Sequence, residues 1–384
     1  MPEQFLHGVE VVEVTSGPRS IRTVASSVIG LIGTAPAAAA DSFPLNTPVV
    51  LAGYQPTLIA ALGTTGTLPA ALDGIYDQAG AVIVVVRVAE GADAAATQTN
   101  VIGGVNGQGQ YTGIKALLGA ESTVGLTPRI LVAPGFSHVT AVLTELVSVA
   151  NKLRAVVVAD GPSTTDAAAL SAATASGSDR VYLVDPKVKV FANGSEVVEH
   201  SSARVAGLIA KSDNDRGFWW SPSNQEILGI TGTERPIDFV LGDASSRANL
   251  LNAGNVATII RQNGFRLWGN RTLSTDPKFA FLSVRRTADI INDSILRAHL
   301  WAVDRNISRT YLQDVSESVN AYLQSLTAQG AILGGECIAS PDLNTAANIA
   351  QGKVFFDVKF TPPYPAEHIT FRSALVNDYL EEIV

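Results

Sequence analysis

The segment ILVAPGFSHVTAVLTELVSVANKLRAVVVA, residues 130–159, decides the fold class of this chain. It begins with the apolar run Ile130–Ala133 and ends with a second run, Ala155–Ala159. Between these runs, Thr140–Leu153 carries apolar residues at helical spacing, namely Val142, Leu143, Leu146, Val149, Ala150 and Leu153. A strand–helix–strand unit with continuously apolar strands is typical of a parallel or mixed sheet that is covered on both faces.

The same alternation continues on both sides of this segment. Val82–Val88 and Val181–Val184 are further apolar runs of strand length. Thr164–Ala175 and Ser201–Lys211 read as helices that open with Ser or Thr caps. The pattern therefore predicts an α/β domain that occupies the first two thirds of the chain.

After Gly217 the sequence becomes richer in Arg, Asn and aromatic residues. We expect helices over 250–263, 287–303 and 315–328 and a short strand over 279–285. Two closing strands are predicted from period-two alternation: Val354, Phe356, Val358 and Phe360 share one face of the first, and Ile369, Phe371 and Leu375 share one face of the second. This part is predicted to form an α+β domain.

The N-terminal segment Gly8–Thr15 reads as a strand that turn residues isolate from the rest of the chain, because Ser16, Gly17 and Pro18 come next. A lone strand must find a sheet elsewhere, since unpaired backbone groups are costly once buried. The final residues 377–384 read as a frayed end or a second orphan strand. We therefore divide the chain into an arm with a linker (1–25), an α/β domain (26–250), an α+β domain (251–376) and a C-terminal arm (377–384).

Composition excludes several classes of function. The net charge is −8 and no basic cluster exists, which argues against nucleic-acid binding. No apolar window is long enough to span a membrane, and the N-terminus lacks a secretion signal, so we expect a cytoplasmic protein. The single cysteine, Cys337, and five scattered histidines offer no metal-ligand spacing.

Catalytic motifs are equally weak, and no cofactor site is predicted. Asp160 and Asp185 fall at strand ends, where α/β folds place ligands, but Asp-Gly and Asp-Pro are ordinary turn formers. Ser137-His138 and His200-Ser201 pair serine with histidine without a GxSxG elbow. An α/β enzyme that uses the strand-end aspartates is therefore only a less favoured alternative, and we expect no enzyme.

Five segments, taken in order, resemble the contractile-tail sheath proteins of short-sheath myophages and R-type pyocins. These are HGVEVVEV (7–14), SSVIGLIGTAP (26–36), DRGFWWSPSN (215–224), GFRLWGNRTL (264–273) and VRRTADIINDSI (284–295). The resemblance covers essentially the whole chain. It implies an outer α/β domain and an inner C-terminal domain that faces a tail tube.

The resemblance also implies that the two arms add strands to the sheets of neighbouring subunits. The residues expected to take part are Val9, Val11, Val12 and Val14 in the N-terminal arm, together with Val354, Phe356, Val358, Phe360, Ile369, Phe371 and Leu375 in the closing strands. The closing strands would form the receiving sheet. Gly17-Pro18 and Pro362-Pro363 would act as joints that let subunits rotate.

In the family's pattern, the helix after Arg286 faces the tube. We therefore expect Arg285, Arg286 and Arg297, with Lys278, to contact an acidic tube surface. The alternative is that these arginines pair with Asp289 and Asp293 inside one subunit.

The implied function is that of a structural subunit of a contractile sheath, which polymerises around an inner tube and contracts from a metastable extended state. Its expected partners are other copies of itself, the tube protein, and baseplate and tail-terminator proteins, with no nucleic acid and no direct membrane insertion. It would be made in the bacterial cytoplasm and assembled into a phage tail or a released bacteriocin particle. A non-contractile tube or capsid subunit is the structural alternative.

Overall fold

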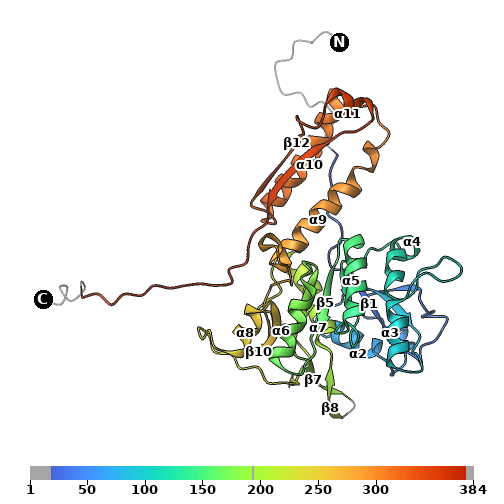
Figure 1. The fold of residues 1–384 in the computed structure, drawn as a ribbon, viewed down its shortest axis with the longest axis vertical. Coiled ribbons are helices and arrows are strands. Elements are labelled where there is room, and N and C mark those ends of the chain that lie inside the picture. Colours follow the sequence, from blue (N-terminus) through green and yellow to red (C-terminus); the bar gives the residue numbers. More distant parts are fainter. Residues whose placement is uncertain (1–18, 193, 378–384) are drawn as a thin grey trace, which may run out of the picture.

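A computed structural model describes residues 19–192 and 194–377, and its largest element is an eight-stranded sheet (Figure 1). The strand order is β11-β10-β6-β5-β4-β1-β3-β2. The parallel strands are β1 (Ile29–Thr34), β3 (Val82–Val88), β4 (Ile130–Val132), β5 (Val156–Asp160), β6 (Val181–Val184) and β10 (Val256–Arg261), and the antiparallel edges are β2 (Pro48–Ala52) and β11 (Phe265–Trp268). The predicted α/β class is confirmed.

Helices cover both faces of this sheet, as the continuously apolar strands require. Successive residues of β3 point to opposite faces, so Ile83 and Val85 join one core cluster while Val84 and Val86 join the other. The first cluster is closed by α2 (Leu68–Tyr76) and α7 (Ser201–Arg216). The second is closed by α5 (Thr140–Leu153) and α6 (Asp166–Ser176), together with η1 (Gly113–Gly119), α3 (Ala94–Ile102), α4 (Ala120–Val124) and α8 (Arg247–Ala253).

The remaining elements of this domain are short. Helix α1 (Pro56–Ala60) follows β2, and a three-stranded sheet of β7 (Val188–Ala192), β8 (Ser195–Glu199) and β9 (Gly232–Thr233) lies at one end of the domain.

A second, smaller unit stands away from the large sheet (Figure 1). It consists of α9 (Leu282–Ala298), η3 (Leu300–Ala302), α10 (Arg309–Ala328), β12 (Gly334–Ala339), α11 (Ala346–Ala350) and β13 (Phe356–Thr361). Its core contains Ile291 from α9, Leu323 from α10 and Cys337 from β12. The unit is therefore a helical layer packed on a two-stranded sheet, in agreement with the predicted α+β character.

The expected boundary between residues 250 and 251 is wrong, because β10 and β11 belong to the large sheet. The helix predicted over 250–263 is in fact the end of α8, a turn in which Asn255 has a positive φ of 62°, and strand β10. The strand predicted over 279–285 is instead η2 (Pro277–Phe279) followed by the start of α9. The α/β domain thus extends to Trp268.

The second closing strand, predicted over 369–376, is also wrong for the isolated chain. Residues 362–377 form neither helix nor strand. They leave the body as an extended segment (Figure 1). From here on, the C-terminal arm means residues 362–377, which precede and adjoin the predicted arm 377–384. Within the described ranges, no helix has the length and apolar character needed to cross a bilayer.

Candidate assembly site

Strands β12 and β13 form the closing hairpin, and β13 confirms that Phe356, Val358 and Phe360 share one face. Strands β12 and β13 are antiparallel, with Cys337 opposite Val358. Phe356, Val358 and Phe360 pack against the core of the smaller unit, whereas Glu336 and Lys359 form an ion pair on the outer face. Val354 is half-buried just before the strand begins. A two-stranded sheet is marginal by itself, and this one depends on the helices beneath it.

The outer edge of β12 is already occupied. The Asn320 side chain, from α10, accepts a hydrogen bond from the Cys337 backbone N–H at 2.7 Å and donates one to its C=O at 2.8 Å. An amide that engages both backbone groups of one edge residue prevents another strand from pairing there. Helix α10 therefore closes this edge of the hairpin.

The outer edge of β13 is open. The Ser340 N–H donates a hydrogen bond to the Phe355 C=O. Because the bonded residues alternate along an antiparallel pair, Asp357 and Lys359 are the next residues whose backbone groups face β12. The backbone groups of Phe356, Val358 and Phe360 then point the other way. Across the part of the chain that the structure describes, these groups have no hydrogen-bond partner. This edge can accept a strand.

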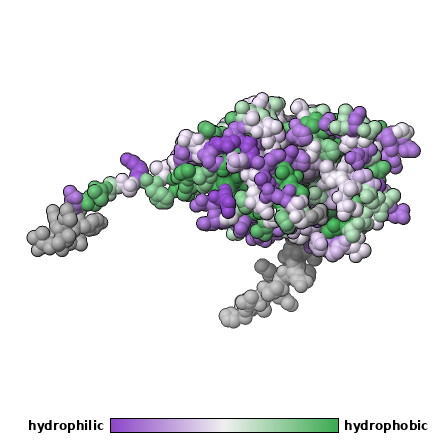
Figure 2. Space-filling view, turned by 90° about the horizontal axis from the view of Figure 1, so that it is seen from below, coloured by the Kyte–Doolittle hydropathy of each residue, from purple (hydrophilic) through white to green (hydrophobic). Residues whose placement is uncertain are grey.

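The C-terminal arm presents apolar side chains to solvent. Ile369, Phe371 and Leu375 are 66, 90 and 101% exposed. Figure 2 shows the arm protruding from the body with hydrophobic residues along it. Exposed apolar residues at alternate positions are a liability in an isolated chain and indicate a surface that becomes buried in an assembly. The corresponding residues of the N-terminal arm, Val9, Val11, Val12 and Val14, lie outside the described residues.

The residues that follow the N-terminal arm are fixed to the smaller unit. The Arg19 N–H donates to the Ser318 hydroxyl, and the Val24 N–H donates to the Ser294 hydroxyl, both at 3.1 Å. The Arg19 guanidinium lies 4.7 Å from the centroid of the Trp301 ring. The chain thus runs along α9 and α10 before it enters β1.

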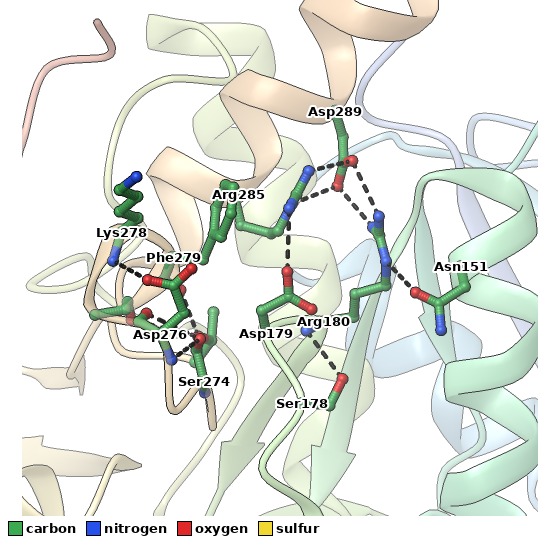
Figure 3. A network of polar contacts seen from close by, with 12 residues as sticks. Asn151, Ser178, Asp179, Arg180, Ser274, Asp276, Lys278, Phe279, Arg285 and Asp289 are labelled. Carbon is green, nitrogen blue, oxygen red and sulfur yellow. Dashed lines mark hydrogen bonds and ion pairs between the residues drawn. The ribbon is translucent and has the colours of Figure 1, made fainter.

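Helix α9 is tied to the large sheet by buried ion pairs, which we call the α9 ion-pair network. Figure 3 shows the guanidinium groups of Arg180 and Arg285 converging on the carboxylate of Asp289. Arg285 also bonds to Asp179 at 3.0 Å. Because Asp289 is only 2% exposed, its two arginine partners are what make its burial tolerable.

The rest of the network extends along the same helix. Arg286 donates to both carboxylate oxygens of Asp213 in α7, at 2.6 and 2.5 Å. Arg129 pairs with Asp293, which also accepts from Arg297 at 2.7 Å. These pairs are buried except at Arg297, whose side chain is 38% exposed. Three buried ion pairs therefore connect helix α9 to the α/β domain.

This arrangement corrects the expected surface row of cations. Arg285 and Arg286 are 9 and 4% exposed and are paired inside the chain, so their charges are not available at the surface. The alternative of pairing within one subunit is confirmed for Arg285 with Asp289 and for Arg297 with Asp293. Lys278 is exposed and close to Asp276. In Figure 3, it lies on the side of Arg285 that is away from Asp289.

Arg297 joins α9 to a third element. Its guanidinium donates to both carboxylate oxygens of Glu121 in α4, at 2.5 and 2.8 Å. Hydrogen bonding to Arg297 lowers the pKa of Glu121 below its usual value, and the same contacts raise the pKa of Arg297. Glu121 is exposed, so this pair is the part of the network most accessible to solvent.

The Ser/His neighbours are brought together, but not as a catalytic site. The Ser137 and Ser202 hydroxyls both donate to Asp160, at 3.0 and 2.8 Å, and His200 lies 3.6 Å from the same carboxylate. Burial lowers the pKa of His200. Among the described residues, neither serine is hydrogen-bonded to a histidine, whereas an activated serine nucleophile needs such a bond. The cluster instead fixes the first turn of α7 to the end of β5.

The other strand-end aspartate is likewise used by the fold. Asp185 is fully buried, accepts a 2.6 Å hydrogen bond from the Ser163 N–H and pairs with Arg235. Burial raises the pKa of its carboxyl group. Arg235 also pairs with Asp166, so the loop after β9 covers the strand ends. In the described part of the chain, no group of His, Cys, Asp and Glu could hold a metal ion.

Sequence reasoning missed Asn320, Asp213 and the pair Arg271–Glu367. Asn320 is a polar residue beside the apolar positions Val319 and Leu323 of α10, which was the available signal. No local sequence pattern identifies Asp213 or Glu367 as a partner, because the arginines that they pair with lie 73 and 96 positions away.

Comparisons with known proteins agree with the geometry. Three family models match: the phage tail sheath protein central domain over residues 109–273, the phage tail sheath C-terminal domain over 274–375, and the tail sheath protein Gp18 domain III N-terminal region over 26–88. The chain is 46% identical to a Pseudomonas aeruginosa protein described as a prophage major tail sheath protein, covering 99% of each. It is 37% identical to the tail sheath protein of Escherichia phage P2, covering 99% of this chain and 98% of that one.

Solved structures show the same fold. The helical sheath of the anti-feeding prophage in its contracted state aligns with a TM-score of 0.73 at 21% identity, over 96% of this chain and 98% of that one. The sheath complex of an extracellular contractile injection system, PVC, also in the contracted state, gives 0.71 at 18% identity over 98 and 99%. The resemblance that the five sequence segments indicate is thereby confirmed, and the chain belongs to the phage tail sheath family, whose members are structural subunits of contractile tails.

Proposed function

We propose that this chain polymerises as a helical sheath around an inner tail tube, and that the sheath contracts from a metastable extended state to drive the tube through a target cell envelope. The polymer would attach to baseplate and tail-terminator proteins at its ends. Synthesis would take place in the bacterial cytoplasm, before assembly into a phage tail or a bacteriocin particle. The work would come from surface that neighbouring subunits bury on contraction, without turnover of a substrate.

Strand exchange between subunits is the proposed linkage. The open outer edge of β13 is the observation that carries it, because three residues there direct backbone groups away from the body that have no partner among the described residues. The C-terminal arm supplies a segment of suitable length whose apolar side chains pack on none of the residues that the structure describes. A strand of a second copy added to β13 would satisfy both.

The side chains support the same geometry. An added strand continues the sheet, so its alternate residues fall on the face that Phe356, Val358 and Phe360 already occupy. Ile369, Phe371 and Leu375 have the period needed to extend that apolar face. Since Asn320 closes β12, the incoming strand is directed to β13.

The tube contact is proposed for Lys278 alone, which is exposed and remains available to an acidic tube surface. The Arg297 guanidinium is 38% exposed, but it is already paired with Asp293 and Glu121. Arg285 and Arg286 would act indirectly, by holding α9 in place. Exposed ion pairs contribute only about 0–1 kcal/mol each, which suits a contact that must break on triggering.

Negative-stain microscopy of the purified chain tests the proposal. We expect long tubular polymers from the complete chain, and a folded but non-polymerising protein after deletion of residues 1–16. The matched control is Lys211→Ala, a substitution of an exposed side chain on α7 that is outside both arms in the sequence, which should polymerise normally. Tubes from the chain without residues 1–16 would exclude a role of the N-terminal arm in assembly.

A further inference from the structure

The C-terminal arm is held to the body at one point beyond the closing hairpin. Arg271, in the loop between β11 and α9, donates to both carboxylate oxygens of Glu367. The Nε–Oε1 distance is 2.8 Å, Nε–Oε2 is 3.1 Å and Nη2–Oε2 is 2.5 Å. A bidentate arginine–carboxylate pair restricts orientation as well as distance. The orientation of the Glu367 carboxylate is thus fixed, although this residue lies six residues after β13 ends.

Aromatic contacts strengthen the same point. The Arg271 guanidinium lies 5.2 Å from the centroid of the Phe281 ring, and Phe281 meets Tyr364 edge-to-face at 6.1 Å. A backbone bridge joins Arg271 to Phe281, so both partners of the arm belong to one small platform. Tyr364 and Glu367 therefore contact the body on both sides of Pro365.

The proline residues make the segment between β13 and this contact stiff. Pro362, Pro363 and Pro365 each have a fixed φ, which limits the bending that a joint needs. All three are partly buried, whereas every residue from Ala366 to Asn377 is exposed. After Glu367, the only hydrogen bond of the described arm joins Thr370 to His368, within the arm itself.

We propose that the Arg271–Glu367 pair is an anchor that fixes where the C-terminal arm leaves the body, so that the joint for subunit rotation begins at His368 and not at Pro362-Pro363. This inference rests on the proposed strand exchange, because a fixed exit matters only if the arm reaches another copy. The segment Pro362–Glu367 then moves with its own subunit. Residues from His368 onward take up the change in angle between subunits.

The anchor depends on arginine geometry and not on charge alone. Lysine cannot donate two parallel hydrogen bonds and stack on Phe281 at the same time. Both side chains are a little over one third exposed, so added salt weakens the pair. The Arg271→Lys variant should therefore release the arm partly, and Arg271→Glu should release it fully.

Distance measurements on the unassembled, full-length subunit test the anchor. Nitroxide labels at Ala321→Cys in α10 and Thr370→Cys in the arm, with Cys337→Ala, report the spread of arm positions by double electron–electron resonance. We expect Arg271→Glu and Glu367→Arg each to widen the distance distribution at least twofold. The double variant R271E/E367R should narrow it again. The matched control is the ion pair Glu336–Lys359, whose reversal as Glu336→Lys/Lys359→Glu should leave the width unchanged.

The outcomes separate the anchor from the function on which it rests. The anchor is contradicted if the distance distribution of Arg271→Glu is as narrow as that of wild type, or if that of the double variant is as broad as those of the single variants. This holds even if the unlabelled wild-type chain polymerises. If the distance distributions have the expected widths but the wild-type chain never polymerises, the anchor is supported and the sheath proposal is contradicted.

Discussion

Arg180 and Asp289 are 109 positions apart in the chain and form a buried bidentate ion pair, with Nη1–Oδ2 at 2.7 Å and Nη2–Oδ1 at 3.1 Å. Arg180 directly precedes β6, and Asp289 lies in the second turn of α9. The pair therefore connects the large sheet to the helix that carries the smaller unit. Helix α9 is thus one connection between the closing hairpin's unit and the α/β domain, beside the segment that runs from Arg19 into β1.

Removal of the Asp289 charge should be strongly destabilising. Asp289→Asn leaves Arg180 and Arg285 buried with only part of their compensation, and loss of one partner of a buried pair typically costs about 3–5 kcal/mol. The free energy of unfolding from urea titration measures this. Asp215→Asn, which removes an exposed pair with Lys211, is the control and should cost less than about 1 kcal/mol. Equal costs for the two variants would contradict the role of the network.

Asn320 should contribute to stability through the edge of β12. Asn320→Ala removes two hydrogen bonds from the backbone of Cys337, and leaving buried groups unsatisfied costs about 1–3 kcal/mol. Thermal and urea unfolding check the value. Gln324→Ala, one turn later on the exposed face of α10, should lie within about 0.5 kcal/mol of wild type. A neutral Asn320→Ala would mean that β12 is closed in another way.

The Glu121–Arg297 pair should make stability sensitive to acid. The folded-state pKa of Glu121 is below its unfolded value, so its contribution is fully present above the usual glutamate range. It is lost as pH falls through the lowered folded pKa. The difference in unfolding free energy between wild type and Glu121→Gln should therefore shrink from pH 7 to pH 3. Glu317→Gln, an exposed residue of α10, is the control for the substitution itself at pH 7. A wild-type to Glu121→Gln difference that stays constant from pH 7 to pH 3 would contradict the role of this pair.

Charge reversal should distinguish the buried arginines from the exposed cations. Arg285→Glu/Arg286→Glu places carboxylates against Asp179, Asp213 and Asp289, so we expect loss of the folded state by circular dichroism. Lys278→Glu should keep the fold and the ability to form tubes without an inner tube. It should weaken co-assembly with the tube protein. Normal co-assembly of Lys278→Glu would remove Lys278 from the contact.

The sequence predicted those parts of the fold that depend on local periodicity. Val84 and Val86 show why, because a strand that is apolar at every position requires cover on both faces. Val256–Ile260 shows the limit, since a short apolar run is compatible with either a helix or a buried strand and only tertiary pairing with β6 decides it. Ile369–Val376 has strand alternation without a strand partner among the residues that the structure describes.

The candidate site was predictable only in part, for similar reasons. The inward face of β13 follows from alternation, as Val358 illustrates. The burial of Arg286 does not follow from the sequence, because its partner Asp213 lies in a helix that is distant in sequence and no local pattern identifies it. Arginines in a helix that also contains acidic residues are compatible with a surface row or an internal network, and only the ion pairs that α9 forms with the α/β domain distinguish the two.

Strand exchange through the C-terminal arm is tested most directly by electron microscopy of a chain that ends at Glu367. This truncation keeps the anchor, the closing hairpin and the α9 ion-pair network, so the protein should remain folded with an unchanged unfolding midpoint. The account predicts single subunits and no tubes where the complete chain forms long ones. Tubes of normal length from the truncated chain would contradict it.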